Sequence, residues 1–447
     1  EKVVTDAPTF LIGGKAVVWS EPKVVAEHGD VTELAATGET DAFRFRGRGE
    51  LWFDGFYKAE IEVEPKDGAA EIPSLDLVWT VPRAAARYLL TPDWAPWGAD
   101  GNFNGRFGVD RNDTSVVWTT GPVCGFAWWC ASDANWVTDG KRPNVAIRRT
   151  AESASVRVKI IAKPSVLKGV AKYVTGVQAT PAKRPDPAWR DRWYWGIGGD
   201  WTTCNWSSYS GVKAGDNMKH VTSLVPAYPK EFDRFLQRKR KEGLDVLVYS
   251  MPTHLSDLDE EWDWYYDTWA RLPGFRWGFK DEFTGKRARL MPCCPSTAAG
   301  DWHVARAERL FREHPLMKGL YYDISSCARC NNVLHGHGGI DAFGRPYGTS
   351  NALDLRDYFL RITKLCRKYD RWLHIHAHNL YMPFVHSFGD VCWPGEEQFH
   401  LYVNNPRYHY LEGIPAEKYE SALNCEIRGM HIAFINQNAR AKSEVPS

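Results

Sequence analysis

Carboxyl groups follow short apolar segments in the second half of the chain. Asp323 comes directly after Gly319-Leu320-Tyr321-Tyr322, and Glu396 and Glu397 come after Trp393 and a Pro-Gly turn. Two carboxyl groups can cleave a glycosidic bond, because one protonates the leaving oxygen and the other acts as nucleophile or activates water. We therefore predict Asp323 as nucleophile or base and Glu396 as acid. Glu397 is the substitute for Glu396, since adjacent extended residues point to opposite sides.

Aromatic and acidic residues near other expected strand ends could hold a ligand. The chain has 21 Trp residues, and Trp packs well against flat, partly apolar ligands such as the faces of sugars. Most Trp side chains of a globular protein nevertheless pack in the core. The residues of this kind that we predict to bind substrate are Asp200, Trp201, Trp206, Asp390 and Trp393.

Three histidines alternate along one expected strand. His374, His376 and His378 share one face because strand side chains alternate, and Asn379 follows them. Such a face could donate hydrogen bonds to sugar hydroxyls, bind a metal ion, or bury histidines whose hydrogen bonds are satisfied inside the core. We predict His376, His378 and Asn379 as substrate-binding residues.

A stretch rich in Cys and His begins shortly after Asp323. Cys327 and Cys330 form a CxxC pair, and His335 and His337 form an HxH pair. Four such ligands could hold a tetrahedral zinc ion, although HxH is not the usual zinc spacing. A loop ordered by hydrogen bonds and a disulfide are the alternatives. We expect no cofactor, and we predict that both histidines contact substrate, because this loop follows Asp323.

Composition excludes several classes of protein. The 447 residues are 44% hydrophobic and 25% charged, which is typical of a globular protein of two or three domains. With 56 Lys and Arg against 55 Asp and Glu, the chain lacks the extended basic face that a nucleic-acid partner requires. No run of about 18 apolar residues occurs, so we expect no membrane span. No oligomeric state is predicted.

The first residue is Glu1 rather than Met. We therefore expect that a signal peptide or a longer N-terminal region has been removed, and that the protein is secreted or periplasmic.

Two kinds of pattern divide the chain. Residues 1–180 contain segments of alternating apolar and polar residues between turn residues, which predicts an antiparallel β-sandwich. Several prolines predict a stiff linker over 181–191. Over 192–447, helices alternate with short apolar strands, which predicts parallel strands in a (β/α)₈ (TIM) barrel.

The expected barrel elements can be placed by residue number. Helices are predicted over 230–243, 302–314 and 353–369. Candidate strands lie near 193–199, 244–250, 287–291, 317–323, 371–377, 388–393 and 427–435. Because an eighth strand is lacking, either one strand is misplaced or the chain is part of a longer protein, and we expect the second. Catalytic groups of such a barrel lie at the carboxyl ends of its strands.

Several motifs resemble those of bacterial glycoside hydrolase 123-like proteins. Residues 176–183, before Trp189-Arg190, resemble the link between their two domains, and 51–56 resemble a strand motif of their N-terminal sandwich. Similar motifs of the second half are Cys294-Pro295-Ser296, Tyr321-Tyr322-Asp323, Leu334-His335-Gly336, Ser387-Phe388-Gly389-Asp390 and Gly395-Glu396. The resemblance implies a β-sandwich followed by a glycosidase barrel, in exported bacterial enzymes that degrade polysaccharides or host glycans.

These residues favour a glycoside hydrolase that removes a terminal sugar from a polysaccharide or glycan. The expected partner is therefore a carbohydrate. One alternative is a carbohydrate-binding protein without catalysis, whose acids would be paired with Arg or Lys. The other is a metal-dependent hydrolase built on the His and Cys residues.

Overall fold

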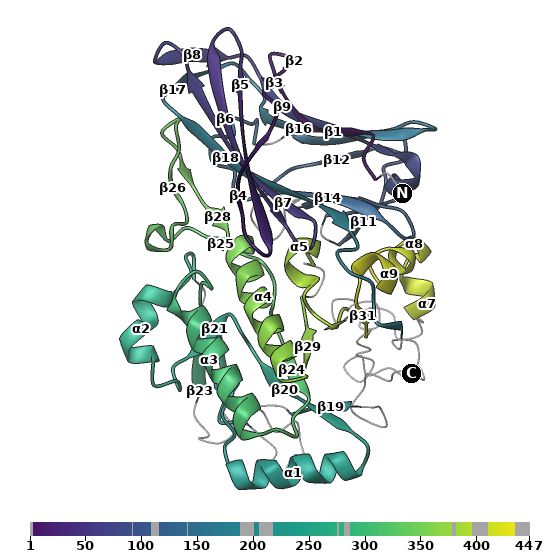
Figure 1. Cartoon of the computed structure of the whole chain (residues 1–447), viewed down its shortest axis with the longest axis vertical. Helices are drawn as coiled ribbons and strands as arrows, with labels where there is room; N and C mark the ends of the chain where they lie inside the picture. Colours follow the sequence, from purple (N-terminus) through teal and green to yellow (C-terminus); the bar gives the residue numbers. More distant parts are fainter. Residues whose placement is uncertain are drawn as a thin grey trace.

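The computed structural model places antiparallel sheets in the N-terminal part of the chain and a parallel sheet with helices in the C-terminal part (Figure 1). It describes residues 3–91, 93–108, 116–140, 142–187, 201–204, 218–274, 277–280, 287–377, 381–395 and 410–433. Within these residues no helix is long and apolar enough to cross a membrane.

Residues up to Thr180 form two antiparallel sheets, here called the N-terminal sheets. The first has the order β12 (Phe103–Gly105), β15 (Val145–Arg149), β16 (Ser153–Ile161), β9 (Leu75–Pro82), β1 (Asp6–Ile12), β2 (Lys15–Ala16). The second has the order β11 (Trp94–Ala95), β10 (Tyr88–Leu90), β13 (Val116–Thr120), β14 (Gly125–Cys130), β18 (Ala171–Thr180), β7 (Phe56–Pro65), β6 (Phe43–Trp52), β5 (Val31–Glu39), β3 (Val18–Trp19). The remaining elements of this part are β4 (Lys23–Glu27), paired with β5, the pair β8 (Ala69–Ile72) and β17 (Ser165–Lys168), and η1 (Arg83–Ala86).

Alternation of apolar and polar residues explains these strands. In β16, Val156 and Val158 are buried while Arg157 between them is exposed, because successive side chains of a strand point to opposite faces. Inward residues of both sheets, such as Leu77 and Phe45, belong to one hydrophobic cluster. The arrangement is consistent with the predicted β-sandwich.

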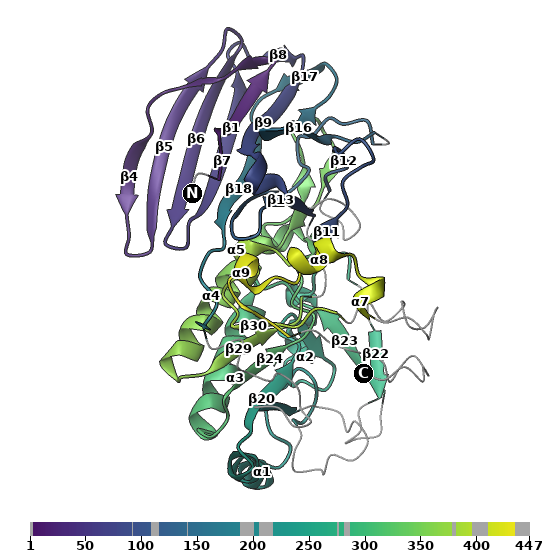
Figure 2. The same cartoon turned by 90° about the vertical axis from the view of Figure 1, so that its right-hand side faces the viewer.

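In the described residues of the C-terminal part, six parallel strands form one sheet. Their spatial order is their chain order: β19 (Trp201–Cys204), β20 (Asp245–Ser250), β24 (Gly319–Tyr322), β29 (Trp372–Ile375), β30 (Val391–Cys392), β31 (His431–Ile432). Helices α1 (Pro229–Lys241), α3 (Ala298–Glu313) and α4 (Ala352–Lys368) pack their apolar faces on this sheet. Figure 2 shows α3 and α4 on one side of these strands.

Smaller elements complete the C-terminal part. An antiparallel sheet has the order β21 (His254–Ser256), β23 (Arg287–Pro292), β22 (Trp277–Lys280). Two short pairs join β25 (Arg329–Cys330) to β28 (Thr349–Ser350) and β26 (Gly339–Ile340) to β27 (Pro346–Tyr347). The short helices are α2 (Trp262–Trp269), η4 (Val333–His335), α5 (Pro383–His386), α7 (Tyr410–Gly413), α8 (Ala416–Glu420) and α9 (Cys425–Arg428).

Most predicted elements of the C-terminal part match this arrangement. The three predicted helices correspond to α1, α3 and α4, and five predicted strands correspond to β20, β24, β29, β30 and β31. The strand predicted at 287–291 exists as β23, but it belongs to the antiparallel sheet, so its assignment to the barrel is wrong. Residues 193–199 lie outside the described residues. A closed (β/α)₈ barrel and the predicted domain boundaries stay predictions.

A buried ion pair joins the N-terminal sheets to α4. Arg356 donates two hydrogen bonds to the carboxylate of Asp54, both at 2.8 Å, and both side chains are nearly buried. The guanidinium also lies over the ring of Phe56, 4.5 Å from its centroid. Phe56 in turn stacks on Phe384 of α5. The two parts of the chain are therefore held together by a bidentate charge pair inside an aromatic contact.

Candidate active site

The two faces of the parallel sheet have different surroundings. Leu320 and Tyr322 of β24 pack in the cluster that contains the helices. Tyr321 between them packs with Trp393 on the opposite face. Asp323 follows Tyr321 by two positions and continues the strand ladder, because its backbone N–H donates to the carbonyl of Ser250. Asp323 is therefore at the carboxyl end of β24, on the face away from the helices.

Three donors hold the carboxylate of Asp323. The Tyr249 hydroxyl donates to Oδ2 at 2.6 Å, the Ile324 backbone N–H donates to Oδ1 at 2.7 Å, and His376 Nδ1 lies 3.0 Å from Oδ1. Burial by itself would raise the pKa of Asp323, but the hydrogen bonds from His376 and Tyr249 outweigh it and lower the pKa to about 2. Asp323 is therefore ionised at neutral pH.

The residue that follows Asp323 has a strained backbone conformation. Ile324 has a φ of +49°, which is rare for a β-branched residue and costs about 1–3 kcal/mol. The Thr253 hydroxyl donates to the Ile324 carbonyl at 3.3 Å, and the Ile324 side chain packs near Met251 and Leu290. These contacts hold the strained turn, which directs the Ile324 N–H at the Asp323 carboxylate.

Tyr321 connects the aromatic side chains beside Asp323. Its ring centroid lies 5.2 Å from that of Tyr249, 5.0 Å from that of Trp393 and 4.9 Å from that of His374. Its hydroxyl lies 2.9 Å from Nδ1 of His376. The predicted residues His376 and Trp393 are thus brought to the neighbourhood of Asp323. Burial lowers the pKa of His374, so its ring is neutral.

Asp390 and Trp201 lie at the other end of the parallel strands. Asp390 precedes β30, pairs with Arg367 at 2.5 Å and accepts the Leu373 N–H at 2.9 Å. The backbone of Trp201 starts β19 and pairs with Asp245, the first residue of β20. Their placement at the carboxyl edge is therefore wrong, because both residues begin a strand instead of ending one. Their predicted roles in substrate binding stay predictions.

Six predicted residues lie outside the described residues. They are Asp200, Trp206, His378, Asn379, Glu396 and Glu397. The convergence of Asp323 with Glu396 or Glu397 therefore stays a prediction.

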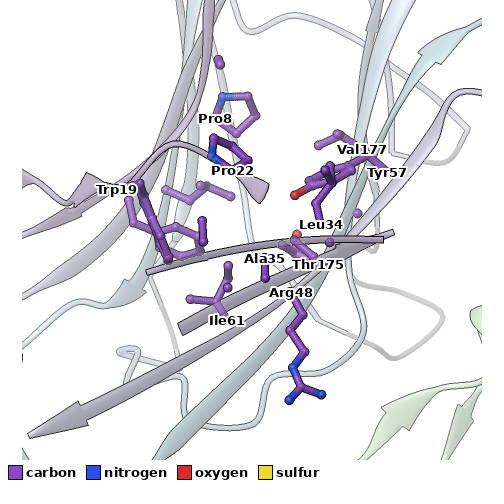
Figure 3. A pocket seen from close by; sticks show the side chains of 18 of the residues that line it. Pro8, Trp19, Pro22, Leu34, Ala35, Arg48, Tyr57, Ile61, Thr175 and Val177 are labelled. Atoms are coloured by element: carbon purple, nitrogen blue, oxygen red, sulfur yellow. The ribbon is translucent and has the colours of Figure 1, made fainter. Parts of the chain in front are cut away.

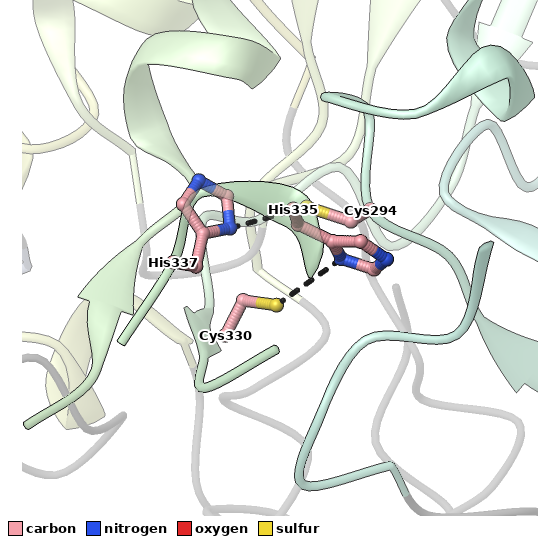
Figure 4. A group of neighbouring side chains, drawn as sticks. All are labelled: Cys294, Cys330, His335 and His337. Atoms are coloured by element: carbon pink, nitrogen blue, oxygen red, sulfur yellow. Dashed lines mark hydrogen bonds between the residues drawn. The ribbon is translucent and has the colours of Figure 1, made fainter. Parts of the chain in front are cut away.

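Three residues of the loop after β24 form a cluster of thiols and imidazoles with Cys294, which lies between β23 and α3. Cys294, Cys330, His335 and His337 have their ligand atoms within 4.8 Å of one another, and Figure 4 shows the four side chains directed toward a common point. The described cysteines, Cys327 and Cys330 included, are free thiols, so the alternative of a disulfide within the CxxC pair is wrong. Cys327 is not a member of the cluster.

In both histidines of this cluster, Nε2 contacts a protein group outside the cluster. His335 Nε2 lies 2.8 Å from the carbonyl oxygen of Thr268, and His337 Nε2 lies 2.9 Å from the carboxylate of Asp354. Their Nδ1 atoms face the thiols. The prediction that His335 and His337 contact substrate stays a prediction; in this structure both ring nitrogens of each histidine face protein groups.

Sequence reasoning missed Cys294 as a member of this cluster. In the sequence, Cys294 was noted only as part of the motif Cys294-Pro295-Ser296. It reaches the loop because β23 and α3 bring it there. Tyr249 and Tyr321 were also missed, and their alternation with apolar neighbours on adjacent parallel strands is the signal that could have shown them.

A separate cavity of about 480 Å³ lies within the N-terminal sheets (Figure 3). Its lining is largely apolar and includes Trp19, Leu34, Tyr57 and Ile61. Among its lining residues Arg48 alone is charged, and Figure 3 shows the guanidinium directed away from the other lining side chains. None of the described residues that line this cavity carries a carboxylate.

No family model and no curated protein sequence matches this chain. Among solved structures, it is similar to an alpha-N-acetylgalactosaminidase from Bifidobacterium bifidum in complex with GalNAc, with 10% identity, a TM-score of 0.40, and coverage of 95% of this chain and 78% of that chain. It is also similar to an alpha-galactosidase from Lactobacillus brevis, with 10% identity, a TM-score of 0.41, and coverage of 97% of this chain and 68% of that chain. A third similar structure is an alpha-galactosidase from Thermus thermophilus in complex with stachyose, with 12% identity, a TM-score of 0.36, and coverage of 96% of this chain and 88% of that chain. Likeness at this level assigns neither a family nor an activity to this chain.

Proposed function

We propose that this protein is a glycoside hydrolase that removes a terminal sugar from a polysaccharide or glycan. The observation that carries the proposal is Asp323, an ionised carboxylate held by Tyr249 and His376 at the carboxyl end of a parallel strand. A positive charge develops on the sugar ring as a glycosidic bond breaks, and a preorganised carboxylate stabilises it.

The low pKa of Asp323 defines its role. A carboxyl group with a pKa of about 2 has no proton to give at neutral pH, so Asp323 is proposed as nucleophile or base. Glu396, which follows Trp393 by three positions, is proposed as the acid, with Glu397 as its substitute. A carboxyl separation of about 5–5.5 Å would give retention of configuration, and about 6.5–9.5 Å would give inversion.

The contacts of Asp323 favour catalysis over simple binding. A carbohydrate-binding protein without catalysis is expected to neutralise this acid with Arg or Lys. The described contacts are instead a phenol, an imidazole and a backbone N–H. These groups orient the carboxylate and keep it ionised without a permanent cation against it.

A metal-dependent hydrolase is less consistent with the geometry. The cluster at Cys294 and Cys330 already offers four protein ligands, whereas a catalytic zinc keeps one position open for water or substrate. The expected secreted or periplasmic location is part of the proposal and is tested separately, by fractionating cells that express the natural gene.

Hydrolysis of a panel of p-nitrophenyl glycosides and reducing-sugar release from polysaccharides test this function. We expect Asp323→Asn to lower kcat by about 10²–10⁴-fold, while circular dichroism shows the chain still folded. Asp267→Asn changes an exposed acid of α2 and is the matched control. Full activity of Asp323→Asn, or glycan binding by the wild type without any product, would contradict the proposal.

A further inference from the structure

We propose that Cys294, Cys330, His335 and His337 bind one zinc ion, which fastens the loop after Asp323 to the start of α3. This inference is independent of the glycosidase proposal, because the four residues are separate from the carboxylate and its partners.

Two sulfur–nitrogen distances within the cluster match those of a tetrahedral zinc site. Zn–S bonds of about 2.3 Å and Zn–N bonds of about 2.0–2.1 Å place a sulfur and a nitrogen ligand about 3.6 Å apart in a tetrahedron. Here Cys330 Sγ lies 3.5 Å from Nδ1 of His335, and Cys294 Sγ lies 3.5 Å from Nδ1 of His337 (Figure 4). These two Cys–His pairs therefore have the spacing of ligands that share one zinc ion, and all four ligand atoms lie within 4.8 Å of one another.

Outer contacts orient the two imidazoles for this role. A zinc-bound histidine commonly donates its other N–H to a carboxylate or a backbone carbonyl, which fixes the ring and its tautomer. His337 has this contact with Asp354, and His335 has it with the Thr268 carbonyl. His335 Nε2 also lies 3.1 Å from Nδ2 of Asn332. When Nε2 donates to these oxygen atoms, the lone pair of Nδ1 is left to bind the zinc ion inside the cluster.

The thiols also have support from their surroundings. The Ser296 hydroxyl donates to Cys294 Sγ at 3.2 Å, and the backbone N–H of Cys294 donates to the Trp269 carbonyl at 3.0 Å. Cys330 lies in β25, which pairs with β28. Both sulfur atoms are thus carried by backbone that is hydrogen-bonded to neighbouring elements.

Local backbone structure brings the two histidines together. Asn332 caps η4, because its side chain accepts the Leu334 N–H. Gly336 then ends η4 with a φ of +74°, a conformation that glycine adopts without the strain of a Cβ. This turn lets residues 335 and 337 direct their rings at the same point.

The loop that carries these ligands has little hydrophobic core of its own. It runs from β24 to α4 and contains only η4 and four strands of two residues each. Val333, Leu334 and Ile340 expose 65%, 80% and 69% of their surfaces. Segments that bury so little apolar surface commonly depend on a disulfide or a metal ion for order, and the cysteines here are free thiols.

Ligand chemistry selects zinc and a structural role. Two sulfur and two imidazole ligands in a tetrahedron are characteristic of zinc, and four protein ligands leave no position for a substrate. Three of the four residues are buried. Because Ile324 and Asp323 precede this loop directly, an ordered loop also keeps the strained turn at Asp323 in place.

Zinc analysis of the full, tag-free chain purified under reducing conditions tests the inference. We expect about one zinc ion per chain, and loss of that zinc in Cys330→Ser and in His337→Gln. Cys327→Ser is the matched control, since this thiol lies in the same loop outside the cluster, and it should keep its zinc. We expect Asp354→Asn to bind zinc about 10–100-fold more weakly.

A measurement on the wild type covers the case in which the variants do not fold. Replacing zinc with Co²⁺ should give the visible spectrum of a tetrahedral site with thiolate charge transfer, and exhaustive chelation should lower Tm reversibly. Reduced wild-type chain that binds neither metal would overturn the inference. So would a Cys294–Cys330 disulfide in the native protein, or equal loss of zinc in Cys327→Ser and Cys330→Ser.

Discussion

Removing the hydroxyl of Tyr249 should change the pH at which Asp323 ionises. This hydroxyl donates to Oδ2 of Asp323 at 2.6 Å, and Tyr249→Phe deletes the bond with little change of shape. The bond favours the ionised carboxylate, so its loss raises the pKa of Asp323. His376 and the Ile324 N–H remain and continue to favour the ionised carboxylate.

The size of the effect follows from the strength of such a bond. A hydrogen bond to a charged group contributes about 1.5–3 kcal/mol, and each pKa unit corresponds to about 1.4 kcal/mol. The pKa of Asp323 should therefore rise from about 2 to between about 3 and 4. Because activity requires the ionised form, the acid limb of kcat/KM should move to higher pH by the same amount.

The assay is kcat/KM against pH for a glycoside that the wild type hydrolyses, with urea unfolding in parallel. Ionised Asp323 stabilises the fold above its unfolded pKa, and this contribution disappears as pH falls from about 4 toward 2. Tyr249→Phe should therefore be less stable at pH 7, with a smaller difference in acid. Tyr265→Phe, an exposed tyrosine of α2, is the control. An acid limb that stays in place or moves to lower pH would refute the reasoning.

Three further variants examine other parts of the structure. Arg356→Met leaves Asp54 buried without its partner, so the free energy of unfolding should fall by about 3–5 kcal/mol in a denaturant titration; an unchanged midpoint would contradict the buried pair. Gly336→Ala places a Cβ at a φ of +74° and should cost about 1–2 kcal/mol together with some zinc affinity, as calorimetry and metal competition would show. Asp390→Asn breaks a partly exposed pair with Arg367, so we expect normal turnover and a loss below about 1 kcal/mol; abolished turnover would return this residue to the active site.

The local sequence pattern was sufficient to predict the helices and strands named here and one residue of the candidate active site, Asp323. The helix predicted over 230–243 corresponds to α1, and the alternation predicted within residues 1–180 is present in β16. Asp323 was expected after an apolar strand and lies there. These features could be predicted because hydrophobic periodicity depends on neighbours along the chain.

Strand partners and strand ends were harder to predict. A short apolar segment has the same pattern in a parallel and in an antiparallel sheet, which is why 287–291 was assigned to the barrel instead of to the sheet of β21 and β22. The strand β30 has only two residues, so an error of a few positions moved Asp390 from the start of a strand to its end. Such an error places a side chain at the opposite edge of the sheet.

Sequence alone determined which residue types could act and roughly where the strands and helices lie. Tertiary structure decided that Cys294 joins Cys330 and the two histidines, that Tyr249 and His376 both reach Asp323, and that the pair of Arg356 and Asp54 closes the interface. These contacts join residues far apart in the chain. They depend on how whole sheets and helices pack, and no periodicity within one segment encodes that packing.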